Sequence, residues 1–201
     1  MKSYSYLALG DSYTIGEGVP IHENFPYQTV QLLRNGGNSF YAAEIIAKTG
    51  WTTDELQTGM QSTHFLPSYD IVSLCIGVNN QYRGRSADEY RLQFEALLQQ
   101  AIQLAGNNAQ HVFVLSIPDW GVTPFAKDRD STAIAQAIDM YNAINKMVAG
   151  HYKVHYLDIT PGTRLAKDDS SLLAADQLHP SGKEYEKWAK KLCAGITTAI
   201  K

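Results

Sequence analysis

The sequence has few cysteines, no long apolar run and no large excess of either charge. Two cysteines, Cys75 and Cys193, are too few to staple a chain of 201 residues, so a disulfide scaffold is excluded and two buried thiols are expected. No stretch approaches the roughly 18 apolar residues of a membrane span. Seventeen Lys+Arg against twenty Asp+Glu give a net charge of −3, which offers no bulk attraction for nucleic acid.

The amino-terminal residues do not have the pattern expected of a signal peptide. Met1 to Gly10 contain no basic region followed by a long apolar stretch, so no signal peptide is predicted. As the sequence stands we expect a cytoplasmic protein, or a secreted one where a leader has been removed.

The composition is that of a folded protein. Hydrophobic residues make up 44% of the chain and charged residues 18%, which supplies enough apolar side chain for a sizeable core and excludes disorder. The 15 glycines and 7 prolines are scattered and mark no repeat or linker. At about 150 residues per domain, the chain is predicted to form a single domain over residues 1–201.

Short apolar runs alternate with helical patterns along the chain. The runs are rich in aromatic and β-branched residues and predict five strands. Between them, capping patterns and apolar stripes at helical spacing predict five helices. The expected strands are Tyr4–Leu9, Phe40–Ala47, Asp70–Ile76, His111–Ile117 and Lys153–Ile159, and the expected helices are Pro26–Arg34, Thr52–Gln61, Ser86–Ala105, Ser131–Ala149 and a last one that begins at Pro180.

This alternation predicts an α/β fold, a three-layer α/β/α sandwich with a five-stranded parallel sheet similar to that of flavodoxin. Nearly continuous apolar strands are expected when helices cover both faces of a parallel sheet. Such sheets carry their chemistry outside the carboxyl ends of the strands, so the segments after the predicted strands are where a site is sought.

A serine follows the first predicted strand, in Gly10-Asp11-Ser12. At the rim of the sheet its hydroxyl can face a cleft and act as a nucleophile. Glycine, aspartate and serine are also turn formers, so these residues alone equally allow a simple turn.

Two further segments carry polar side chains of chemical interest. Asn79, after the third strand, is an amide donor that can stabilise an oxyanion, with a turn as the alternative. Asp176 and His179 stand three residues apart, just before the last helix, with Pro180 expected at its first position. A carboxylate there can hold one imidazole nitrogen while the other faces the cleft, and a capping motif is the alternative.

In their order along the chain, these segments resemble the motifs of the SGNH hydrolases, also called GDSL-type esterases and lipases. The resemblance spans residues 10 to 179 and implies hydrolysis of carboxylic esters through an acyl-enzyme intermediate. The matching residues are Gly10-Asp11-Ser12, then Gly50 after the second strand, Gly77-Val78-Asn79 after the third, and Asp176 with His179 near the carboxyl terminus.

The resemblance implies a role for each matching residue. Ser12 would be the nucleophile, His179 the general base and then the general acid, and Asp176 the residue that orients His179. The oxyanion hole would consist of the backbone N–H groups of Ser12 and Gly50 and the side-chain amide of Asn79. These roles fit the chemistry, because a serine hydroxyl is a poor nucleophile until a base takes its proton and glycine lets the backbone approach a ligand closely.

One position departs from the family pattern. Where the family reads Gly-x-Asn-Asp, this chain has Asn80 after Asn79. The donor position is kept and the neighbouring carboxylate is lost, so the supporting hydrogen bonds are expected to differ. Asp11 is expected to be structural rather than catalytic.

No metal and no cofactor are expected. The histidines form no His-Glu-x-x-His pattern, and the loop that holds Ser12 lacks the Gly-x-x-x-x-Gly-Lys core of a phosphate loop. The serine also lies outside a Gly-x-Ser-x-Gly elbow, which argues against an ordinary α/β-hydrolase.

Aromatic side chains in the strand-end loops are the candidates for substrate binding. They are Trp51, Tyr82, Trp120 and Phe125, with packing of the loops as the alternative for each. No strongly apolar lid helix is predicted, which favours a small-molecule substrate: a soluble ester, an acetylated carbohydrate or a short-chain acyl ester.

Other functions stay open at this point. One is a lysophospholipase or thioesterase of the same family. Another is a non-catalytic flavodoxin-like domain that binds a ligand such as FMN. A third is an inactive relative that serves as a carbohydrate-binding or interaction module. The sequence does not determine the oligomeric state.

Overall fold

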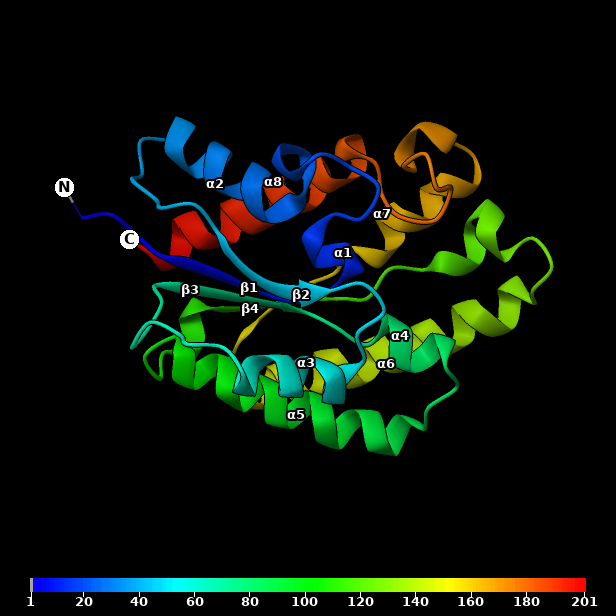
Figure 1. Ribbon diagram of the computed structural model, residues 1–201, viewed down its shortest axis with the longest axis horizontal. Coiled ribbons are helices and arrows are strands. Elements are labelled where there is room, and N and C mark those ends of the chain that lie inside the picture. Colours follow the sequence, from blue (N-terminus) through cyan, green and yellow to red (C-terminus); the bar gives the residue numbers. More distant parts are fainter. Residues whose placement is uncertain (1) are drawn as a thin grey trace.

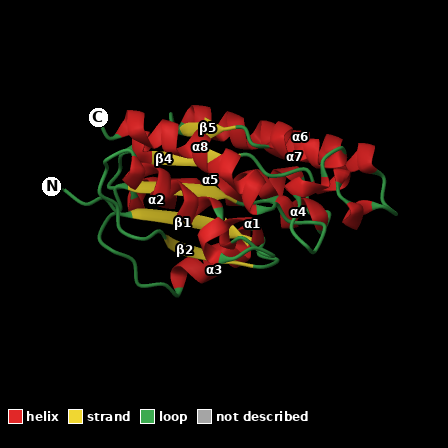
Figure 2. Ribbon diagram, turned by 90° about the horizontal axis from the view of Figure 1, so that it is seen from above, coloured by secondary structure: helices red, strands yellow, loops and turns green. Residues whose placement is uncertain are grey.

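Five parallel strands form one sheet in the computed structural model, which describes residues 2–201. The strands lie in the order β2-β1-β3-β4-β5 (Figure 2), so β1 is paired with β2 on one side and with β3 on the other. This is the doubly wound, flavodoxin-like order, and it confirms the predicted sheet. The strands are β1 (Tyr6–Asp11), β2 (Glu44–Lys48), β3 (Ile71–Cys75), β4 (Val112–Leu115) and β5 (His155–Leu157).

Helices cover both faces of the sheet. In Figure 1, α2 and α8 lie above the sheet and α3, α5 and α6 lie below it, which confirms the predicted α/β/α sandwich. Three shorter helices, α1, α4 and α7, follow β1, β3 and β5. The helices are α1 (Ser12–Ile15), α2 (Phe25–Asn35), α3 (Thr53–Gln61), α4 (Val78–Tyr82), α5 (Ala87–Leu104), α6 (Ser131–His151), α7 (Thr160–Arg164) and α8 (Gly182–Ala199).

The apolar character of the strands matches their place in the sheet. Every residue of the central strands β1, β3 and β4 is buried, whereas the edge strands β2 and β5 are mostly half-buried. A parallel strand covered on both faces needs apolar side chains at every position rather than at alternate ones. This is why continuous apolar runs mark these strands in the sequence.

Several predicted boundaries were wrong. Phe40 makes only an isolated bridge, and β2 begins at Glu44. Pro180 is not the first residue of the last helix, because it pairs with Leu173 in an antiparallel bridge and α8 begins at Gly182. The sequence predicts loops where α1, α4 and α7 form, since helices of four or five residues are too short to show a period of about 3.6 residues.

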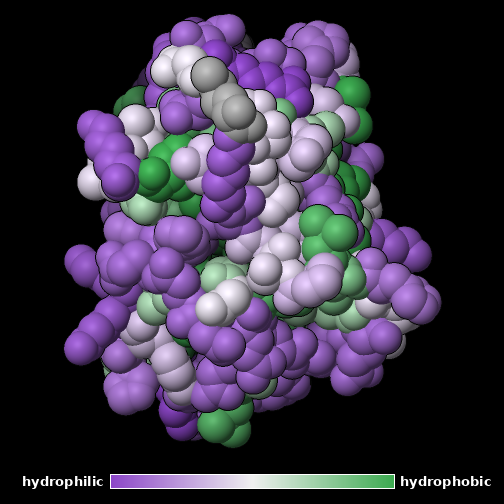
Figure 3. Space-filling view, turned by 90° about the vertical axis from the view of Figure 1, so that its left-hand side faces the viewer, coloured by the Kyte–Doolittle hydropathy of each residue, from purple (hydrophilic) through white to green (hydrophobic). Residues whose placement is uncertain are grey.

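The end of the molecule that carries both termini is shown in Figure 3. Hydrophilic residues cover most of this face, and hydrophobic residues show as separate patches between them. Within residues 2–201, no helix combines the length and the apolarity that crossing a membrane would need.

Tyr90 of α5 connects α5 and α6 to the backbone at the end of β3. Its buried hydroxyl donates to the carbonyl oxygen of Ile76 at 2.9 Å and to Oδ1 of Asn145 in α6 at 2.6 Å, so two acceptors share one proton. Its ring stacks on that of Tyr141, with the ring centres 4.3 Å apart. These contacts fix the backbone just before the segment that carries Asn79.

Removing this hydroxyl should weaken the fold measurably. We expect Tyr90→Phe to lower the free energy of unfolding by about 1–3 kcal/mol, because two buried acceptors lose their donor. Tyr41→Phe is the matched control: Tyr41 is 64% exposed, and its substitution should change stability by less than about 0.5 kcal/mol. Urea denaturation measures both, and equal effects of the two substitutions would contradict this account.

Candidate active site

Ser12 stands where β1 passes into α1. Asp11 caps α1, since its Oδ1 accepts a hydrogen bond from the N–H of Tyr13 at 3.0 Å. The helix folds back so closely over the strand that a Cβ on Gly10 would overlap the hydroxyl of Thr14, and glycine is therefore required there. This turn leaves the side chain of Ser12 at the carboxyl end of the sheet.

The loop before α8 brings His179 and Asp176 to Ser12. Nε2 of His179 lies 2.9 Å from Oγ of Ser12, and Nδ1 of His179 lies 2.6 Å from Oδ2 of Asp176. The other oxygen of Asp176 accepts the N–H groups of Leu178 and His179, each at 3.0 Å. Of the two alternatives drawn from the sequence, the carboxylate beside the imidazole is present. Asp176 also closes a turn by accepting these two N–H groups, but it does not cap α8, whose N-cap is Ser181.

The surroundings of Asp176 favour its ionised form. Partial burial acts to raise its pKa, but the hydrogen bonds from the ring of His179 and from the two N–H groups outweigh burial, and the pKa falls below its usual value. An anion beside Nδ1 favours the tautomer that carries its proton on Nδ1. The lone pair of Nε2 then faces the hydroxyl of Ser12.

Gly50 lies in the loop between β2 and α3. Its φ angle is 82°, a left-handed conformation that favours glycine. Its N–H makes no backbone hydrogen bond within residues 2–201, and Gly50 borders the same pocket as Ser12. A backbone donor is therefore available beside the serine.

Asn79 and Asn80 are neighbours in α4 and make different contacts. Nδ2 of Asn79 donates to the carbonyl oxygen of Trp51 at 3.0 Å and lies 3.4 Å from Oδ2 of Asp11. Asn80 is fully buried: its Oδ1 accepts the N–H of Thr53 at 3.0 Å and its Nδ2 donates to the hydroxyl of Thr53 at 2.7 Å. The departure from the family pattern therefore keeps a hydrogen-bond acceptor at this position.

A pocket of about 170 Å³ opens at the carboxyl ends of the strands. Tyr82, Trp120 and Phe125, three of the four aromatic candidates, form one wall, and the ring of Tyr82 packs edge-on against that of Trp120 at 5.2 Å. The structure does not place Trp51 in the wall, because its ring packs against Gly59 of α3. The remaining lining comes from Ser12, Gly50, Asn79 and His179, together with Tyr13, Thr49, Val78 and Leu178.

Tyr13 and Leu178 line the pocket but are not among the residues predicted from the sequence. Tyr13 is buried, and its ring centre lies 4.8 Å from that of the imidazole of His179. Each is the chain neighbour of a predicted site residue, Tyr13 of Ser12 and Leu178 of His179. That adjacency is the signal that could have found them.

Comparison of the sequence with known families gives one clear match. The model of the GDSL-like lipase/acylhydrolase family matches residues 8–187. No curated protein sequence matches this chain significantly.

Solved structures share the fold at low sequence identity. Axe2, an acetylxylan esterase from Geobacillus stearothermophilus, has a TM-score of 0.74 at 17% identity, covering 96% of this chain and 94% of its own. A member of the lipolytic protein G-D-S-L family from Veillonella parvula has a TM-score of 0.72 at 17% identity, over 98% and 99%. The psychrotrophic esterase EstA from Pseudoalteromonas sp. has a TM-score of 0.70 at 15% identity, over 98% of both chains.

Asp11 is a buried carboxyl group beside the site. Burial raises its pKa to about 7, against the hydrogen bonds from the N–H of Tyr13 and the amide of Asn79, which lower it. An aspartate in the unfolded chain titrates at a pKa near 3.9. Between these two values the folded protein holds a proton that the unfolded chain lacks, so this group makes the protein less stable as the pH rises.

Replacing Asp11 by asparagine keeps a capping oxygen and removes the titration. As the pH rises from about 4 to about 8, the wild type should lose stability and Asp11→Asn should not. The free energy of unfolding of the variant relative to that of the wild type should therefore increase over this range, by on the order of 4 kcal/mol at most, because one pKa unit corresponds to about 1.36 kcal/mol. Urea denaturation of both proteins across this range measures the difference. A difference that does not change with pH would contradict the assignment to Asp11.

Proposed function

Because the chain belongs to the GDSL-like lipase/acylhydrolase family and is a carboxylic ester hydrolase, we propose that Ser12, His179 and Asp176 are its catalytic triad. The observation that carries this proposal is the chain of two hydrogen bonds, 2.9 Å from Ser12 to His179 and 2.6 Å from His179 to Asp176. A nucleophile, a base and an orienting group within hydrogen-bond reach are what acyl transfer by a serine requires.

The reaction follows from these positions. Nε2 of His179 takes the hydroxyl proton as Oγ of Ser12 attacks the ester carbonyl carbon, and a tetrahedral oxyanion forms. The imidazolium then gives that proton to the leaving alkoxide, which departs as the alcohol and leaves an acyl-serine. Water, deprotonated by the same nitrogen, then attacks the acyl carbon; the bond to Oγ of Ser12 breaks, the imidazolium returns its proton to Oγ, and the carboxylic acid is released. The carboxylate of Asp176 stabilises the imidazolium in both steps.

The oxyanion would be stabilised by donors on three neighbouring strand ends. These are the N–H groups of Ser12 and Gly50 and the amide of Asn79, which all border the same pocket. One N–H of Asn79 is engaged at 3.0 Å by Trp51, while its contact with Asp11 is longer, at 3.4 Å. The N–H on the Asp11 side is therefore the more weakly held of the two and is the one we assign to the oxyanion. Each such donor is worth about 3 kcal/mol of barrier.

The size and walls of the pocket support a short acyl group. Its volume of about 170 Å³ lies below the roughly 300–1,000 Å³ of pockets that enclose drug-sized ligands. The exposed rings of Tyr82 and Phe125, at 46% and 50%, offer flat apolar surfaces at its mouth on which a sugar can stack. We infer that the substrate is a small ester, such as an acetylated carbohydrate. The acetylxylan esterase activity of the similar protein Axe2 is in keeping with this inference.

Loss of the nucleophile should abolish the reaction. We expect Ser12→Ala to lower ester turnover by a factor on the order of 10⁶ and to prevent labelling by a fluorophosphonate, since no activated oxygen remains. Hydrolysis of 4-nitrophenyl acetate and the mass of the intact protein after labelling are the measurements. Ser62→Ala, at the end of α3, is the control and should retain both. Turnover of Ser12→Ala within about tenfold of wild type would exclude Ser12 as the nucleophile.

The acyl chain length should limit the rate. We expect kcat/KM to be highest for acetyl esters and to fall steadily toward palmitoyl esters, because a long chain cannot be enclosed in a pocket of about 170 Å³. A series of 4-nitrophenyl esters, which share one leaving group, isolates this effect, and acetylated sugars extend it to natural alcohols. An increase from acetyl to palmitoyl would favour a lysophospholipase or thioesterase instead.

A further inference from the structure

Two successive carbonyl groups of the loop after β2 accept hydrogen bonds from one short helix. Nδ2 of Asn79 donates to the oxygen of Trp51 at 3.0 Å, and Nη2 of Arg83 donates to the oxygen of Gly50 at 2.7 Å. Asn79 lies in α4, and Arg83 is the residue that ends it, with its own N–H donating to the oxygen of Asn79 at 3.0 Å. Helix α4 therefore holds the loop at two adjacent peptide groups.

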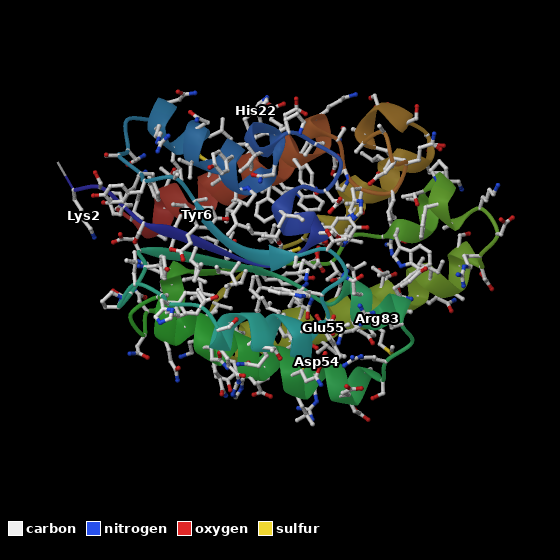
Figure 4. All side chains as sticks on the ribbon, viewed as in Figure 1. Lys2, Tyr6, His22, Asp54, Glu55 and Arg83 are labelled. Carbon is white, nitrogen blue, oxygen red and sulfur yellow. The ribbon has the colours of Figure 1, made fainter. Side chains whose placement is uncertain are left out.

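The guanidinium of Arg83 is fixed from a second side. Its Nη1 lies 3.3 Å from Oε1 of Glu55 in α3, and Glu55 in turn accepts the N–H of Thr52 at 2.9 Å. Figure 4 shows Arg83 and Glu55 below the sheet, together with Asp54, where α3 and α4 meet. A planar guanidinium carries its N–H groups in a rigid fork, so it can hold a carbonyl and a carboxylate at set angles.

Arg83 lies behind the pocket. It does not form part of the wall, whereas Gly50 does. Its side chain is 42% exposed, so the ion pair with Glu55 adds little to the stability of the fold. What this side chain holds is the carbonyl of Gly50, which belongs to the peptide group between Gly50 and Trp51.

We propose that Arg83 is a positioning residue for the oxyanion hole: by holding the carbonyl of Gly50, it keeps the N–H of Gly50 directed at the same point as the amide of Asn79. This inference rests on the proposed function, in which both groups stabilise the oxyanion. Without this role, Arg83 would be a partly exposed charged residue at the end of α4 with no function.

The physical reason is the freedom of a glycine peptide. A glycine with a φ angle of 82° has no Cβ to confine its backbone, so the N–H of Gly50 can swing away from the site. Donors lower a barrier most when they need no reorganisation at the moment of reaction. A charge-assisted hydrogen bond to the carbonyl on the other side of the same residue restrains that motion.

Substitution of Arg83 should reduce the rate of turnover and leave substrate binding intact. For Arg83→Met we expect kcat on 4-nitrophenyl acetate to fall by on the order of tenfold with KM nearly unchanged. This is less than the roughly 10²–10³ lost with a whole donor, because Gly50 keeps its N–H. Arg83→Lys, which keeps a cationic donor, should recover part of the loss, and so should millimolar guanidinium added to Arg83→Met.

Arg85→Met is the matched control. Arg85 lies two residues farther along and also reaches α3, donating to Oδ1 of Asp54 at 2.8 Å, but it does not contact the Gly50 loop. It should keep the kcat of the wild type. An equal loss in Arg85→Met, an unchanged kcat in Arg83→Met, or a rise in KM alone would each overturn the inference; the last would mean that Arg83 binds substrate directly.

Fluorophosphonate labelling separates this inference from the proposed function. If the wild type is not labelled at Ser12, the proposed function fails. If the wild type is labelled and Arg83→Met turns over and is labelled at the same rate, the role of Arg83 alone fails. Should Arg83→Met lose its fold by circular dichroism, the division between kcat and KM in Arg83→Lys decides the question.

Discussion

The hydrogen bond between Ser12 and His179 joins residues that are 167 positions apart, and the geometry of the pocket depends on it. It forms because β1 lies inside the sheet while α8, which packs beside α2 above it, begins just after His179 (Figure 1). The hydrogen bond therefore forms only when the first and last parts of the chain have folded against each other. A buried parallel sheet is what supplies this long-range order, since its strands end at a common edge.

Much of the architecture could be read from the sequence because burial leaves a plain signal. The central strands are buried at every position and mostly apolar, and Ser12, Asn79 and His179 stand where a doubly wound sheet exposes its strand ends. Strand boundaries were less accurate, because an apolar residue such as Phe40 can pack on the core without joining the ladder. The predicted start of the last helix was wrong for a similar reason. Proline is common at the first position of a helix, but Pro180 forms an antiparallel bridge with Leu173.

The direction in which a side chain turns could not be predicted. Trp51 is next to Gly50 in the chain, but its ring lies on Gly59 of α3, where the absence of a Cβ leaves room for it. Arg83, at the end of α4, is a charged and partly exposed residue like many on a protein surface, and only its hydrogen bond to the carbonyl of Gly50 distinguishes it. Such contacts join segments distant in the sequence, so no local pattern encodes them.

The pairing of β1 with β2 on one side and β3 on the other has a consequence for how such a site can evolve. Ser12 follows the middle strand of the three, Gly50 follows one neighbour and Asn79 follows the other. Adjacent strands lie about 4.8 Å apart whatever side chains they carry, because backbone hydrogen bonds set that spacing. In the proposed oxyanion hole, the spacing of the donors is thus a property of the peptide ladder. Helices and loops around it can diverge until little sequence identity is left, and the basic dimensions of the site persist.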